Sequence, residues 1–196
     1  MRKLIFFIGP AGAGKTTLAK VWARKHGGAF LDMDTLLRPA AEAIMTLAGQ
    51  DPNDRDSPTY KTYCRDLGYR ITMDAALENL ELGLDAIVVG PFTKELADPL
   101  WLEKELSNVG ATISDVCVRA VFVYLPSENA YQERIRTRGS VLDVWKLDNW
   151  KHFSQSLVRK EIKWLIDPSS ILYFDNSGPF SSVKLYELEK FIYRRK

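Results

Sequence analysis

The residues with the clearest chemical meaning lie near the N-terminus, in the segment GPAGAGKTT at residues 9–17. Its pattern is G-x-x-x-x-G-K-T, in which small residues let successive backbone N–H groups surround a phosphate. Lys15 is expected to contact the terminal phosphates of a nucleotide, and the Thr16 hydroxyl is expected to bind Mg²⁺. The predicted nucleotide-binding residues of this segment are Gly9, Ala11, Gly12, Ala13, Gly14, Lys15, Thr16 and Thr17. The pattern therefore predicts ATP and Mg²⁺ as ligands.

Two carboxylates, Asp32 and Asp34, follow a short apolar run in the sequence FLDMDTLL. Because they lie two residues apart, they would point the same way in an extended chain. Asp32 is expected to organise the metal, and Asp34 is expected to accept the proton of an attacking hydroxyl. The alternative is that Asp34 only caps a helix that begins at Thr35.

Two arginines, Arg134 and Arg138, are spaced four residues apart and would share one helix face, whereas Arg136 would not. One guanidinium is suited to stack on adenine and the other to bind the γ-phosphate. Residues 134–163 hold eight Lys/Arg and three Asp/Glu. This composition favours a lid at about residues 138–150 that closes over ATP, although a solvated helix face would have a similar composition.

The elements that must position these residues alternate along the chain. Apolar runs predict strands at 3–9, 29–31, 86–90, 116–125 and 171–174. Helices are expected at 14–26, 35–48, 60–82, 127–138, 150–164 and from 181, with an interrupted helical region over 91–110. This order predicts an α/β fold in three layers, with a five-stranded parallel sheet covered by helices on both faces. We expect a single domain over residues 1–196, with the turns after the first three strands converging at the carboxyl edge.

A segment at about residues 35–83 is where the substrate pocket is expected. It contains several Arg and Tyr residues, although any one of them is more often packed or solvated than a ligand. The residues proposed to contact substrate are Asp34, Arg38, Arg55, Tyr60 and, after the third strand, Gly90. The third strand ends in Gly90-Pro91-Phe92, without the aspartate of many nucleotide-dependent motors and GTPases. Asp32 or Asp34 is then left to organise the metal.

Composition excludes several other classes of function. The formal net charge of +2 is too small to indicate a nucleic-acid or membrane partner. Cys64 and Cys117 provide no disulfide framework, and two histidines make a structural zinc site unfavourable. The apolar run after Met1 is too short for a signal peptide. These features predict a cytoplasmic protein with no membrane segment, which is either a monomer or a homodimer.

Taken together, the glycine-rich segment, the D-x-D pair, the glycine after the third strand and R-x-x-x-R before a lid resemble the small P-loop kinases. Gluconate kinase and shikimate kinase are the most similar by motif, within a wider family that includes polynucleotide kinases and chloramphenicol phosphotransferase. The resemblance implies a P-loop NTPase fold in which Asp34 contacts the acceptor hydroxyl and Asp32 lies near Mg²⁺. It also implies that Arg134 and Arg138 are the lid arginines. Two departures are the Gly90-Pro91-Phe92 turn, where shikimate kinases have three glycines, and the long insertion, which gluconate kinases lack.

The functional hypothesis is transfer of the γ-phosphate of ATP to a hydroxyl of a small polar metabolite. Lys15, Asp34 and Arg138 are its predicted catalytic residues. One alternative is a polynucleotide 5′-hydroxyl kinase, which would need a basic path lined by aromatic residues. The other alternative is a regulatory module that binds ATP without acceptor chemistry, which predicts a filled or absent pocket beside Asp34.

Overall fold

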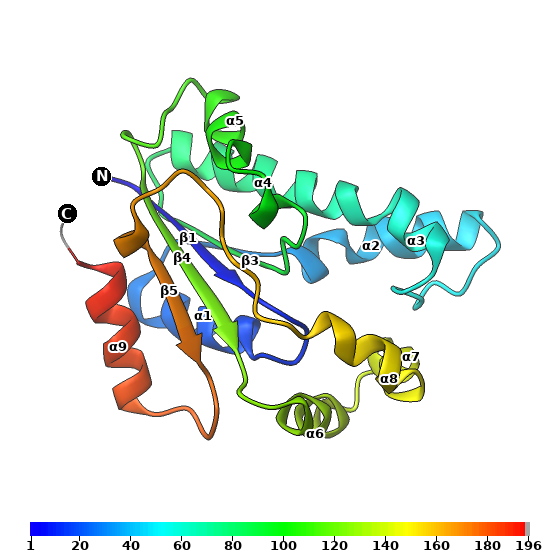
Figure 1. Cartoon of the computed structure of the whole chain (residues 1–196). Coiled ribbons are helices and arrows are strands. Elements are labelled where there is room, and N and C mark those ends of the chain that lie inside the picture. The colour runs from blue at the N-terminus through cyan, green and yellow to red at the C-terminus, as the bar shows by residue number, and fades with distance from the viewer. Residues whose placement is uncertain (195–196) are drawn as a thin grey trace.

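Five parallel strands form the centre of the computed structural model, which describes residues 1–194 (Figure 1). The strands are β1 (Lys3–Ile8), β2 (Ala29–Asp32), β3 (Ala86–Gly90), β4 (Cys117–Tyr124) and β5 (Ile171–Asp175), in the spatial order β2-β3-β1-β4-β5. The central strand β1 pairs with β3 on one side and β4 on the other, both parallel. The predicted α/β fold with a five-stranded parallel sheet is confirmed.

Helices cover both faces of the sheet because successive strand residues point to opposite sides. The helices against the sheet are α1 (Lys15–His26), α4 (Arg65–Glu81), α5 (Trp101–Ser107), α6 (Glu128–Arg138) and α9 (Ser182–Ile192). Phe6 faces a core formed with α4 and α5, whereas Phe7 faces a core formed with α1, α6 and α9. Figure 1 shows α9 and α1 on the side of the sheet opposite to α4 and α5.

The insertion forms an arm of three helices that extends from the sheet (Figure 1). It consists of α2 (Met33–Leu47), α3 (Pro58–Tyr63) and the first half of α4. Its small core is built from Leu37, Ala41, Met45, Tyr60 and Cys64. Gly68 of α4 lies so close to α2 that a Cβ atom there would be 2.7 Å from a Leu37 methyl carbon. The single helix expected over residues 60–82 is instead two helices, α3 and α4, which meet at Cys64.

Helix α2 begins two residues before the predicted start at Thr35. The Asp32 carboxylate caps it by accepting a hydrogen bond from the Asp34 backbone N–H at 3.0 Å. The alternative prediction that Asp34 caps this helix is therefore wrong, since Asp32 is the cap. Pro39 lies inside this helix.

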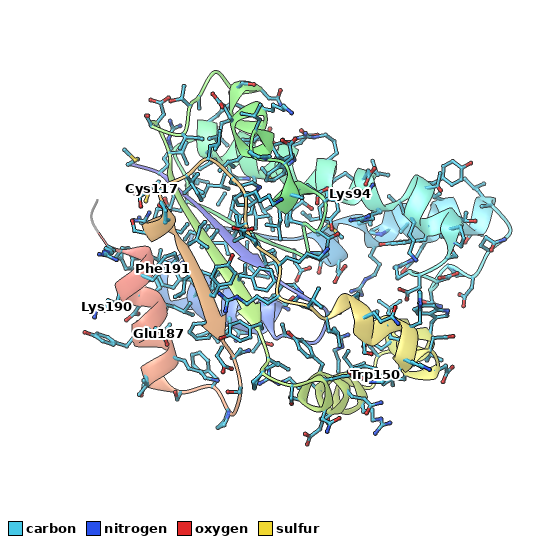
Figure 2. All side chains as sticks on the ribbon, viewed as in Figure 1. Lys94, Cys117, Trp150, Glu187, Lys190 and Phe191 are labelled. Atoms are coloured by element: carbon cyan, nitrogen blue, oxygen red, sulfur yellow. The ribbon has the colours of Figure 1, made fainter. Side chains whose placement is uncertain are left out.

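Short helices occupy the predicted lid region. Helix α6 ends at Arg138, and the C-cap residue Gly139 has a positive φ of 61°. It is followed by η2 (Val141–Asp143), α7 (Val144–Asp148), α8 (Trp150–Phe153) and η3 (Ser154–Ser156). The indole of Trp150, the first residue of α8, donates to a Glu128 carboxylate oxygen at 2.6 Å, and Figure 2 labels Trp150 where the short helices lie next to α6. This contact joins the far end of the lid region to the start of α6.

The helix predicted over residues 150–164 is wrong beyond Phe153. Residues 157–164 are irregular because their polar groups bind elsewhere in the chain. The Lys163 backbone N–H donates to Leu96 O at 2.9 Å, and the Trp164 indole donates to Glu95 O at 2.9 Å. The Trp164 ring packs on Phe6 at a centroid distance of 4.9 Å. The remaining short elements are η1 (Glu95–Ala97), within the region expected to be helical, and η4 (Pro168–Ser170).

Within residues 1–194, no helix combines the length and the apolar character that crossing a bilayer requires.

Candidate active site

The glycine-rich segment forms the turn between β1 and α1, as its pattern predicts. Gly9, Gly12 and Gly14 have φ values of 136°, 82° and 93°, which side chains other than that of glycine rarely permit. A Cβ atom on Gly9 would be 2.1 Å from the Val123 carbonyl oxygen. Gly9 therefore lets the turn pack directly against β4. Neither Gly9 nor the buried Ala13 lines the cavity that the turn faces.

Lys15 lies at the N-terminal end of α1, where its Nζ donates to Pro10 O at 2.8 Å. Burial lowers the pKa of Lys15 from its ordinary value to about 8, and the negative charges of Asp34 and Asp32 partly oppose that shift. A phosphate would add negative charge at this position and favour the ammonium form. The lowered pKa indicates that the ammonium is held at a desolvated position beside two carboxylates.

Thr16 and Asp32 are directly hydrogen-bonded. The Thr16 hydroxyl donates to Asp32 Oδ2 at 2.8 Å, while Asp32 Oδ1 accepts from the start of α2. Burial raises the pKa of the Asp32 carboxyl, and the Thr16 hydrogen bond opposes that shift. Both oxygens of the Asp32 carboxylate accept hydrogen bonds, so this side chain links the end of β2 to the first turn of α1 through Thr16.

The oxygen atoms of Thr16 and Asp32 fit the predicted Mg²⁺ position. Within residues 1–194, no three His, Cys, Asp or Glu side chains are grouped for a metal. Mg²⁺ in nucleotide sites takes one or two carboxylates and completes its shell with phosphates and water. Two adjacent oxygen ligands at the phosphate-binding turn therefore suit this ion.

Asp34 lies in the first turn of α2 and lines the same cavity as Lys15. The extended geometry expected from Asp32 to Asp34 is not found, because the helix begins at Met33. Asp32 is buried at the strand end, whereas Asp34 is exposed. The two carboxylates thus have different surroundings, one fixed and dry and the other accessible to a second molecule.

One cavity of about 1200 Å³ contains nearly all of the predicted site. The turns after β1, β2 and β3 converge on it, as expected for the carboxyl edge of a parallel sheet. The predicted site residues that line it are Ala11, Gly12, Gly14, Lys15, Thr16, Thr17, Asp32, Asp34, Arg38, Arg55, Tyr60, Gly90, Arg134 and Arg138. A space of this size exceeds the usual range for one small ligand.

The arm supplies the side of the cavity away from the glycine-rich turn. The Arg55 guanidinium lies over the Tyr60 ring at 5.2 Å and donates to Pro52 O at 2.8 Å. Arg65 lies over the Tyr69 ring at 5.8 Å and donates to the Thr93 hydroxyl. Each guanidinium is thus held against an aromatic ring at the edge of an open space.

Gly90 is required where β3 meets the cavity. A Cβ atom there would be 2.9 Å from the ring of Phe92, which is fully buried and has a positive φ of 46°.

The two lid arginines have different partners. Arg134 donates to Ala13 O at 3.2 Å and to Asn176 O at 2.5 Å, so it is bound to the glycine-rich turn. Arg138 instead forms an ion pair with Asp143, with Nε 2.7 Å from Oδ2.

The structure adds Asn176, Asp143 and Lys146 to the polar residues predicted for the site. Asn176, just after β5, donates its side-chain N–H to Ala13 O at 2.8 Å. Asp143 and Lys146 are ion-paired at 3.0 Å beside Arg138. The rule that sites gather at the carboxyl ends of parallel strands would have pointed to Asn176. No local pattern separates Asp143 from an ordinary solvated aspartate.

Comparison with known proteins identifies the family of this chain. A family model described as the AAA domain matches residues 4–155, and the chain belongs to that family. It is 28% identical over 139 residues to a bifunctional pantoate ligase/cytidylate kinase of Synechococcus sp. (strain CC9311), covering 71% of this chain and 25% of that protein. The chain therefore spans about a quarter of the length of this curated relative.

Solved structures with a similar fold extend over almost the whole chain. A sugar kinase from Janibacter sp. HTCC2649 has a TM-score of 0.63 at 15% identity, covering 98% of this chain and 95% of that one. A gluconokinase from Sinorhizobium meliloti 1021 has a TM-score of 0.51 at 18% identity, covering 98% and 91%. The resemblance to small P-loop kinases is thereby confirmed at the level of the fold.

Proposed function

We propose that this protein transfers the γ-phosphate of ATP to a hydroxyl group of a small polar metabolite. The observation that carries the proposal is the single cavity in which the glycine-rich turn, Lys15, Asp34 and the arginines of the arm all meet. Its volume of about 1200 Å³ has room for a nucleotide and a second molecule. A regulatory module without an acceptor would have a filled or absent space beside Asp34, so the open cavity favours the enzyme.

Each residue has a role that follows from its position. Lys15 binds the terminal phosphates, with the backbone N–H groups of the glycine-rich turn and the N-terminus of α1. Thr16 and Asp32 would hold Mg²⁺, which neutralises phosphate charge when it is bound. Arg138 faces the cavity from the lid and stabilises charge on the transferring group. Asp34 orients the acceptor hydroxyl and takes its proton as the new phosphate ester forms.

A nucleoside monophosphate is a second candidate acceptor. In that case the γ-phosphate is transferred to a phosphate group of the acceptor rather than to a hydroxyl group. The names of the curated relatives favour it, since a cytidylate kinase of Dichelobacter nodosus (strain VCS1703A) is 49% identical over 41 residues. That match covers 21% of this chain and 18% of the relative. The arginines of the arm, Arg38, Arg55 and Arg65, would suit a phosphorylated acceptor.

The test is ATP consumption measured against a panel of acceptors that includes sugars, sugar acids, nucleosides, nucleoside monophosphates and a 5′-hydroxyl oligonucleotide. Asp34→Asn is expected to lower kcat by about 10²- to 10⁴-fold while ATP still binds, since it removes the proton acceptor. Asp51→Asn, an exposed change in the loop of the arm, is the matched control. No acceptor-dependent turnover, or full activity of Asp34→Asn, would contradict the proposal.

A further inference from the structure

A cluster of two cations and one buried carboxylate lies in the lid region, and the proposed roles use only one of its members. Asp143 is 1% exposed and is the common partner of Arg138 and Lys146. Arg138 binds its Oδ2 atom through Nε at 2.7 Å and through a second nitrogen at 2.5 Å. Lys146 binds the other oxygen, Oδ1, at 3.0 Å. Both carboxylate oxygens are therefore occupied, and the cluster has a net charge of +1.

The two cations also share the cavity with the glycine-rich turn. Arg138 and Lys146 line it, and the positive charges of both help to lower the pKa of Lys15. On its other side, Lys146 is close enough to Asp56 of the arm for its charge to act on that carboxyl. Lys146 therefore lines the cavity within electrostatic reach of Lys15 on the nucleotide side and of Asp56 on the acceptor side, and a phosphoryl group would transfer between these two sides.

Each cation keeps donors that no group within residues 1–194 uses. The Lys146 side chain is only 14% exposed, and its ammonium donates to Asp143 and to Leu142 O at 3.0 Å. An ammonium has three N–H donors, so one remains. Arg138 uses Nε and one terminal nitrogen, which leaves its other terminal nitrogen. Two like charges this close would repel each other, and the buried carboxylate between them stabilises the pair before any ligand arrives.

We propose that Lys146 is a further phosphate-binding residue that contacts the γ-phosphate of the nucleotide, and that Asp143 is the positioning residue that sets the places of Lys146 and Arg138. This inference rests on the proposed function, because it requires a nucleoside triphosphate on the glycine-rich turn. A purely structural salt bridge would stabilise the lid helices and affect every nucleotide equally. A γ-phosphate contact instead affects ATP and leaves ADP unchanged.

The experiment compares the affinities for ADP and for an ATP analogue with a non-hydrolysable β–γ bridge, both with Mg²⁺, by calorimetry. Lys146→Met keeps the aliphatic stem and removes the charge. It is expected to weaken binding of the ATP analogue about 10- to 100-fold, the usual worth of a charged hydrogen bond, and to change ADP binding less than twofold. Lys151→Met, an exposed lysine of α8 outside the cavity, is the matched control and is expected to change neither. Lys146→Arg, which keeps the charge, is expected to recover most of the loss.

Asp143 is tested through its coupling to Lys146. Asp143→Asn is expected to lower the affinity for the ATP analogue, and the loss is expected to be smaller when Lys146→Met is already present, since one of the two positioned cations is gone. Asp148→Asn, an exposed change at the end of the following helix α7, is the control. Thermal unfolding checks that each variant is folded, and if Asp143→Asn does not fold, the Lys146 variants decide alone.

The outcomes separate the two proposals. Equal losses for ADP and the ATP analogue, or no loss with Lys146→Met, would overturn the γ-phosphate contact while leaving nucleotide binding intact. If Asp143→Asn lowers the affinity for the ATP analogue equally in the wild-type protein and in the Lys146→Met variant, the positioning role is overturned. A wild-type protein that binds neither nucleotide would overturn the proposed function and this inference together.

Discussion

The lowered pKa of Lys15 leads to a defined pH dependence of nucleotide binding. In the free protein, burial lowers the pKa of this ammonium from 10.5 to about 8. A bound phosphate adds negative charge next to it and raises that pKa again. Binding therefore requires the protonated form, and affinity is highest below pH 8 and falls as the pH rises above it.

The magnitude follows from the fraction of protein that carries the proton. With a pKa of about 8, roughly three quarters of the free protein has a charged Lys15 at pH 7.5, and about one eleventh has it at pH 9. The affinity for ADP is thus expected to fall roughly eightfold over this interval. The phosphates of ADP do not contribute, since the last phosphate proton has a pKa near 6 and is already lost.

The assay is calorimetric titration with ADP in EDTA, so that no metal titrates with the site. At pH 9 the wild-type protein is expected to take up close to one proton per ADP bound, measured by comparing buffers of different ionisation enthalpy. Lys15→Arg keeps its charge throughout and is expected to show no pH dependence. A flat profile for the wild-type protein, or binding without proton uptake at pH 9, would refute the reasoning.

Two further predictions concern the scaffold of the site, each measured as the free energy of unfolding in denaturant. Gly9→Ala is expected to lower the free energy of unfolding by at least about 2 kcal/mol, because φ is 136° and the new Cβ would be 2.1 Å from Val123 O. Gly27→Ala is the comparison, because Gly27 has a positive φ of 74° but no neighbouring atom within 4 Å of the new Cβ. Equal losses from the two glycine changes would contradict the role of the clash. Trp22→Ala is expected to cost about 3–5 kcal/mol, because this 2% exposed ring fills the core between α1 and the sheet, and a loss below about 1 kcal/mol would contradict that packing.

The sequence predicted most of the fold because its main signals are local. The five strands are short apolar runs, and a parallel sheet buried on both faces needs no alternation to identify them. The glycine-rich turn was identified because its conformation depends on residues within a single segment. Convergence of Gly12, Asp32 and Gly90 on one cavity followed from the rule for strand ends.

The features that sequence reasoning missed depend on contacts that the local residue pattern does not specify. Residues 157–164 lost their predicted helix because Trp164 and Lys163 bind the turn near Leu96. Asp32 became the cap of α2 because its carboxylate, held by Thr16, also reaches the N–H two residues further on. Asp143 is buried and pairs with Arg138 and Lys146, five and three residues away. An exposed helical segment offers ion pairs at similar spacing, so the spacing alone does not show that this aspartate is buried.

The distribution of charge bears on which acceptor the cavity serves. Nine Lys/Arg and five Asp/Glu line it, an excess of four positive charges in a chain whose formal net charge is only +2. The other residues of the chain therefore hold eighteen Lys/Arg and twenty Asp/Glu. A single-stranded nucleic acid is bound along an extended basic path, and the affinity depends on many phosphate contacts. Positive charge concentrated in one cavity, with a slightly negative remainder, instead favours a compact anionic ligand set such as ATP with a small acceptor.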